Sequence, residues 1–133
     1  TSFALVMPTP LGALISEGEE GDYADDPALV VWSSDEGRVV ERLTFRQVSF
    51  VAARAARALR SHGVRPGDSV ALLSHPTLDY FAAVSGVLSL GAVAVNINWR
   101  APLDTMQYMA LLGRCKRVLA SKHFVESGAA SRL

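Results

Sequence analysis

Cysteine and histidine are scarce in this sequence, and their scarcity excludes several classes of protein. Cys115 is the only cysteine among 133 residues, so the chain holds neither an internal disulfide framework nor a cysteine-based metal cluster. Basic residues on both sides of Cys115 predict a lowered thiol pKa, although a lone cysteine just before an apolar strand is more typical of packing. The three histidines, His62, His75 and His123, have no partner at the spacing of a metal-ligand motif. The sequence therefore predicts no metal site.

The chain also lacks an excess of charge and a long apolar run. Thirteen basic and thirteen acidic residues give a net charge of zero at pH 7, which predicts no nucleic-acid partner and no attraction to an anionic membrane. Serines, asparagines and glycines interrupt the longest uncharged stretch, 80–99, so no transmembrane segment is predicted. The first residues lack the charged-then-apolar pattern of a secretory signal, which favours an intracellular protein.

The charges that are present are separated along the chain. Six acidic residues lie between Glu17 and Asp26, whereas all thirteen basic residues lie from Arg38 onward. We therefore expect residues 1–27 to be an acidic N-terminal segment, mostly loop, and residues 28–133 to be an incomplete α/β subdomain. The acidic stretch is either a surface loop or a segment that docks on a basic partner or on the arginines of its own domain.

A hairpin and a well-signalled helix are predicted next. Strands at 28–33 and 39–43 are separated by a turn, and a helix is expected at 45–62. Thr44 and Gln47 match the capping-box pattern, and Gly63 suits the left-handed position that ends a helix. The arginines of this helix lie on the face opposite its apolar stripe, and with no aromatic residues among them we interpret that face as solvated: Arg46, Arg54, Arg57, Arg60.

Strands and helices alternate in the second half of the chain. Three short runs are apolar on both faces, which is typical of parallel strands covered by helices on both sides: 70–73, 92–95, 118–120. One helix is expected to open at Pro76 and run to Leu90, and another to span 102–112. The first of these is apolar nearly all round, so we expect it to be buried on more than one side. The fold class predicted is an open, mostly parallel α/β sheet with helices on both faces and a short N-terminal β-hairpin.

No catalytic constellation can be placed on these elements. The strand-to-helix junctions read SHPT and NINWRAP, without the glycine-rich loop that holds phosphates. His75 follows a strand at its carboxyl end, where α/β active sites lie, but the adjacent Pro76 favours a role in the turn. We therefore assign no catalytic, cofactor-binding or metal-binding residue to this chain.

The stretch from Leu43 to Pro102 resembles the opening of the adenylate-forming enzymes, the superfamily of acyl-CoA synthetases, aryl-CoA ligases and luciferases. The features that carry the resemblance are the LTF entry to the alanine-rich helix, the segment GVRPGDSVALL and the segment GVLSLGAVAVNINWR. The sequences of these segments most resemble those of the fatty acyl-CoA synthetase branch. Four residues that match the family are expected to serve as scaffold at a strand end and turn: Asn96, Asn98, Trp99, Arg100.

The resemblance implies an enzyme that joins a fatty acid to CoA through an acyl-adenylate, releasing AMP and pyrophosphate. The family's motifs for ATP, Mg and catalysis cannot be placed on residues 1–133. We therefore expect an N-terminal fragment that is inactive alone and binds none of these cofactors, while ATP, Mg and CoA serve the complete enzyme. Its partner would be the rest of the enzyme, or another chain, which would cover the apolar helix 78–90. We therefore expect at least one apolar side chain of this helix to be exposed when the chain is considered by itself.

Other interpretations stay open. The chain could instead be a non-catalytic interaction module derived from this family and retained in a larger assembly, or an unrelated α/β binding domain. Ser131-Arg132-Leu133 matches a variant of the peroxisomal address, which applies if Leu133 is the natural C-terminus. Whether the coding sequence continues into a Ser/Thr/Gly-rich loop separates the fragment from the module.

Overall fold

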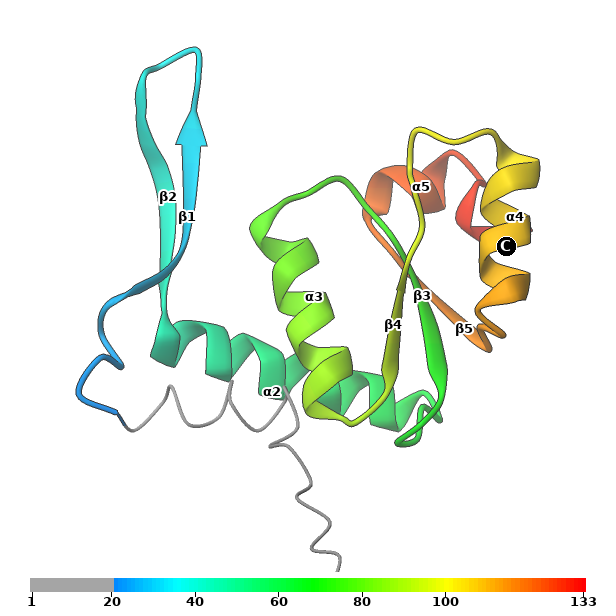
Figure 1. The fold of residues 1–133 in the computed structure, drawn as a ribbon, viewed down its shortest axis with the longest axis horizontal. Helices are drawn as coiled ribbons and strands as arrows, with labels where there is room; N and C mark the ends of the chain where they lie inside the picture. The colour runs from blue at the N-terminus through cyan, green and yellow to red at the C-terminus, as the bar shows by residue number, and fades with distance from the viewer. Residues whose placement is uncertain (1–20) are drawn as a thin grey trace, which may run out of the picture.

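The computed structural model describes residues 21–133 as a β-hairpin, a long helix and a three-stranded α/β unit (Figure 1). Of the acidic segment expected at 1–27, residues 1–20 lie outside the described residues. Residues 21–26 form turns that lead into the hairpin. The elements follow in this order: β1 Pro27–Ser33, β2 Arg38–Thr44, α2 Phe45–Ser61, β3 Ser69–Leu73, α3 Leu78–Ser89, β4 Val93–Asn96, α4 Leu103–Leu112, β5 Arg117–Ala120, α5 Lys122–Glu126 and a 3-10 turn Ala130–Arg132.

Local signals account for both ends of α2. The Thr44 hydroxyl accepts a hydrogen bond from the Gln47 N–H at 3.2 Å, and the Gln47 side-chain oxygen accepts one from the Thr44 N–H at 2.8 Å. The predicted capping box is therefore confirmed. At the other end Gly63 has a φ of 85°, and the Val64 N–H donates to the Leu59 carbonyl at 3.1 Å, which folds the chain back onto the helix.

The three strands after α2 form one parallel sheet in the order β4-β3-β5, as the sequence predicted. β3 is the central strand, and its residues alternate between the two faces of the sheet. Val70 and Leu72 point toward α2 and α3, whereas Ala71 and Leu73 point toward α4 and α5. Helices therefore cover both faces of β3, in agreement with the predicted fold class (Figure 1).

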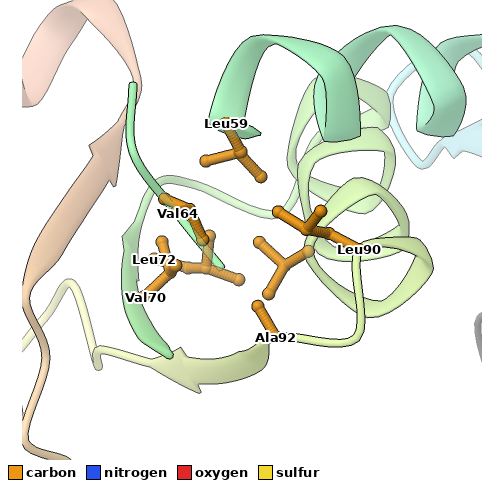
Figure 2. Packing of buried hydrophobic residues seen from close by; sticks show 7 residues of the cluster. Leu59, Val64, Val70, Leu72, Leu90 and Ala92 are labelled. Atoms are coloured by element: carbon orange, nitrogen blue, oxygen red, sulfur yellow. The ribbon is translucent and has the colours of Figure 1, made fainter. Parts of the chain in front are cut away.

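The core on the first face joins α2, α3 and the sheet (Figure 2). Its buried residues come from α2, α3, β3 and the turns that follow the helices: Leu59, Val64, Val70, Leu72, Val87, Leu90, Ala92. The two helices touch at Gly86, where an added Cβ would lie 2.4 Å from the Ala55 Cβ. Because atoms cannot approach so closely, only glycine at this position lets α3 lie directly on α2.

A second core lies on the opposite face, beneath α4 and α5. It gathers six buried residues: Ala71, Leu73, Ile97, Met106, Ala110, Phe124. Gly113, which caps α4, lies against β4, since an added Cβ would be 2.9 Å from a Val95 methyl carbon. The left-handed residue after this helix is Arg114, with a φ of 52°.

The second helix differs in detail from the prediction. α3 begins at Leu78 rather than at Pro76, because the Thr77 hydroxyl accepts from the Tyr80 N–H at 3.2 Å and caps the helix there. Val87 is fully buried, but Phe81 is 44% exposed, so the expected exposed side chain on this helix is confirmed. None of the helices described is long and apolar enough to cross a membrane.

Candidate functional site

Three turns at the carboxyl ends of the parallel strands bring an aromatic cluster together. His75 follows β3, Trp99 follows β4, and His123 lies in the first turn of α5. The His75 ring centroid lies 4.4 Å from that of Trp99, 5.4 Å from that of His123 and 5.1 Å from that of Phe124. Residues that are about 25 and 50 positions apart in the chain therefore form one contiguous surface, as the parallel topology requires.

The scaffold residues around Trp99 form a turn that holds its ring in place. The Ile97 N–H donates to the Leu72 carbonyl at 2.9 Å, and the Arg100 N–H donates to the Asn98 side-chain oxygen at 3.1 Å. The Arg100 guanidinium lies 4.5 Å from the centroid of the Trp99 ring, within the range of a cation–π contact. The turn thus presents a cation and an indole beside His75.

Among the residues described, this cluster has no nucleophile–base arrangement. Within residues 21–133, neither His75 nor His123 forms an ion pair with a carboxylate, and no group of three potential metal ligands is present. His62 lies elsewhere, at the end of α2, where its Nδ1 is 2.8 Å from the Ala58 carbonyl. The Ser121 hydroxyl, beside the cluster in sequence, is buried without a hydrogen-bond partner. Sequence spacing did not predict the approach of His75 to His123, because only the strand order creates it.

The environment of Cys115 corrects the prediction made from its neighbours. Burial raises the pKa of the Cys115 thiol, whereas the adjacent Arg114, Lys116 and Arg117 were expected to lower it. Two of these basic side chains bond to other groups: Lys116 pairs with Asp68 at 3.0 Å, and Arg117 donates to the His62 carbonyl at 3.3 Å. The thiol packs against the second core, so it is a structural residue.

Asp68 links the amino-terminal ends of β3 and β5, at the opposite end of the sheet. Its carboxylate accepts from the Arg65 N–H at 2.9 Å and from the Lys116 ammonium at 3.0 Å. The hydrogen bond from Arg65, together with that from Lys116, lowers the pKa of Asp68. The sequence Arg65-Pro66-Gly67-Asp68 predicts a tight turn with glycine at a positive φ, and Gly67 has a φ of 85°.

The exposed face of α2 also differs from the prediction. Phe50 is 60% exposed on that face, and the Arg54 guanidinium lies 5.8 Å from its ring centroid. An aromatic residue is therefore present among the arginines. In addition, Asp25 pairs with Arg46 at 3.1 Å, and the Tyr23 ring packs edge-on against Phe45. In the described part of the acidic stretch, Asp25 therefore contacts one arginine of this face from an exposed turn.

Two cavities flank Leu119 on the face of β5 that points toward α2 and α3. One, of about 280 Å³, lies between α2 and β5 and is lined by apolar residues that include Ala58 and Val70. The other, of about 300 Å³, lies between the start of α3 and the end of β5 and also borders Ser121. The core between α2, α3 and the sheet therefore ends at β5, where no described helix fills the two cavities.

The fold and the site together define a class. The chain is similar to the crystal structure of the anthranilate-CoA ligase AuaEII in complex with anthranoyl-AMP, with a TM-score of 0.71 and 28% identity. The match covers 92% of this chain and 23% of that one. The architecture is thus that of the N-terminal part of an adenylate-forming ligase. Residues 19–132 match the family model for the AMP-binding enzymes, and the chain belongs to this family.

Curated relatives support the same assignment with different substrates. Bacitracin synthase 1 of Bacillus licheniformis is 33% identical over 86 residues, which are 65% of this chain and 2% of that protein. The 3-oxocholest-4-en-26-oate–CoA ligase of Rhodococcus rhodochrous is 36% identical over 83 residues, or 62% of this chain and 14% of the ligase. This chain therefore spans a small part of the length of its relatives.

Proposed function

We propose that this chain is the N-terminal scaffold of an AMP-forming fatty acyl-CoA synthetase. The observation that carries the proposal is the match of residues 19–132 to the AMP-binding enzyme family. The choice of a fatty acid rests on the sequence of the segment GVLSLGAVAVNINWR and is consistent with the 36% identity over 83 residues to the 3-oxocholest-4-en-26-oate–CoA ligase. The complete enzyme would convert a fatty acid, ATP and CoA to acyl-CoA, AMP and pyrophosphate.

The part played by this chain is structural. Phosphates of ATP require backbone N–H groups of a glycine-rich loop or a cluster of cations, and Mg requires carboxylates beside them. The described junctions after β3 and β4 carry an aromatic cluster instead, with Arg100 stacked on Trp99. ATP, Mg and CoA would therefore be held by elements outside these 133 residues, in the same polypeptide or in a partner chain.

The test is ATP–pyrophosphate exchange. The purified 133-residue chain should give no exchange with any fatty acid, because we expect residues 21–133 to offer no site for a triphosphate or its Mg. The assembly that contains this chain in its native source should exchange with fatty acids at rates well above those with benzoates or amino acids. Exchange by the chain alone would contradict the scaffold role, and a preference for benzoates or amino acids would contradict the substrate class.

A second candidate function is that of a non-catalytic interaction module. The observation that favours it lies on α4, where Leu111 is 76% exposed beside the exposed Leu112 and Tyr108. Apolar side chains at i, i+3 and i+4 form a stripe that a partner helix can cover. The mass of the intact polypeptide in its native source separates the two: a synthetase has a mass several times 14.2 kDa, or co-purifies with a chain that brings the total to that size.

A further inference from the structure

The helix α4 is apolar on two sides, and only one of them faces the sheet. Met106 and Ala110 are buried in the second core. The side that points away from them carries Tyr108, Leu111 and Leu112, each at least 61% exposed. These three side chains, the apolar stripe of α4, lie at i, i+3 and i+4 and form a continuous surface. Because α4 lies across the sheet from α2 and α3, neither of those helices can cover the stripe (Figure 1).

A charged residue lies at each end of the stripe. Asp104 is in the first turn of α4, and Arg114 follows the end of the helix. Both residues are exposed, and within residues 21–133 neither forms an ion pair. Since a helix rises about 1.5 Å per residue, the two residues lie about 15 Å apart along the helix axis. Tyr108 and Leu111 lie between them, so the surface reads negative, apolar and positive from one end to the other.

The backbone of Arg114 is an independent sign that its side chain has a role. With a φ of 52°, it is the one non-glycine residue with a positive φ among the residues described. A residue with a Cβ adopts this conformation at a cost, and glycine or asparagine is the usual residue after a helix. A strained residue whose charge has no opposite partner in the described chain is consistent with a contact outside it.

We propose that the apolar stripe of α4 binds the same stripe of a second copy of this chain, with the two helices antiparallel about a two-fold axis. A two-fold interface is self-complementary, because each contact occurs twice with the copies exchanged. In the antiparallel arrangement Tyr108 of one copy meets Leu111 of the other, and Asp104 meets Arg114 at both ends. A parallel arrangement would place Asp104 against Asp104 and Arg114 against Arg114, so charge complementarity selects the antiparallel pair.

The size of the interface sets its strength. One short helix from each copy makes a small interface, which is typical of weak and transient association, so we expect a dissociation constant of roughly 10–100 µM. At a concentration of about 1 µM, at which unfolding can be measured, the protein would be monomeric. A substitution in the stripe would therefore change dimerisation without changing the stability measured at that concentration.

The test is analytical ultracentrifugation of the complete polypeptide that contains these residues, from about 1 µM to about 300 µM. The weight-average mass of the wild type should rise from that of the monomer toward twice that value. Leu111→Glu should raise the dissociation constant at least about tenfold, because it places a charge in the apolar contact on both copies. A wild type that stays monomeric at the highest concentration, because another protein or another segment covers the stripe, would overturn the proposal. Dimerisation that Leu111→Glu leaves unchanged would do the same.

Two charge variants test the orientation of the helices. Asp104→Arg and Arg114→Asp should each dimerise at least about tenfold more weakly than the wild type, since each alone brings like charges together twice. An equimolar mixture of the two should dimerise as tightly as the wild type, because the mixed pair restores opposite charges at both ends. Asp79→Arg makes the same change in the first turn of α3 and should leave dimerisation unchanged. With folding checked by circular dichroism, a mixture that does not recover dimerisation would overturn the antiparallel pairing.

Discussion

At the contact between α2 and α3, the sequence and the structure predict opposite effects of a substitution on the stability of the protein. Glycine in the middle of a helix costs about 0.5–1 kcal/mol relative to alanine. Helix propensity alone therefore predicts that Gly86→Ala stabilises the protein. In the fold, however, the added Cβ would lie 2.4 Å from the Ala55 Cβ, 3.1 Å from the Ala56 N and 3.2 Å from the Ala52 O.

The steric term outweighs the propensity term. The nearest atoms belong to the backbone of α2 and to a Cβ fixed to it, so the two helices must move apart to admit the methyl group. Overpacking of this kind costs about 1–3 kcal/mol, so we expect Gly86→Ala to lower the free energy of unfolding by roughly 1–2 kcal/mol after the gain in propensity. The assay is denaturant unfolding of the chain, monitored by circular dichroism. The variants are compared at the same dependence of the free energy of unfolding on denaturant concentration.

Two further variants make the test specific. Ser89→Ala, on the exposed side of the same helix, should be neutral or stabilise by up to about 0.5 kcal/mol. Ala55→Gly removes the nearest obstructing atom, so Gly86→Ala should cost at least about 0.5 kcal/mol less in that background. A Gly86→Ala protein that unfolds at higher denaturant concentration than the wild type, as Ser89→Ala does, would refute the close approach of α2 and α3.

Three other substitutions test the remaining links between sequence and fold. Thr44→Ala should cost about 0.5–2 kcal/mol in thermal or denaturant unfolding through loss of the cap, and an unchanged stability would show that the capping box does not form in solution. Leu72→Ala should cost about 2–5 kcal/mol, whereas Leu111→Ala should stay within about 0.5 kcal/mol, and equal effects would contradict the assigned core. Because the pKa of Asp68 is lowered in the folded state, its contribution to stability is present above its ordinary pKa of 3.8 and is lost as the pH falls through the lower folded-state value. The stability difference between wild type and Asp68→Asn should therefore be constant from neutral pH to pH ~5 and disappear in acid, and a difference that grows in acid would disprove the pairing with Arg65 and Lys116.

Local chemistry explains why much of the fold could be predicted. The cap at Thr44, the left-handed Gly63 and the turn at Gly67 each depend on a few adjacent residues, and the structure confirms all three. The apolar strands could also be predicted, because a strand that is buried on both faces is a continuous run of apolar residues in the sequence. The boundary of α3 was wrong by two residues, since Thr77 competes with Pro76 as the start of the helix.

The candidate site was less accessible to such reasoning. The approach of His75 to Trp99 and His123 requires three turns from separate crossover connections to meet at one edge. The spacing between these residues in the chain carries no signal of that meeting. The thiol of Cys115 shows the same limit, because its basic neighbours in sequence predicted the opposite direction of its pKa shift.

The sequence by itself determined the elements, their parallel pairing and the family, because these follow from short-range hydrogen bonding, apolar periodicity and motifs that are contiguous in the chain. The tertiary structure alone decided which strands lie at the edges of the sheet, which side chains meet at the carboxyl ends of the strands and where two helices touch. These features depend on distances between residues far apart in the chain, such as Gly86 and Ala55 or Leu119 and Ala58. The handedness of the crossovers is the physical link between the two, since it relates the order of the elements in the chain to the spatial order β4-β3-β5.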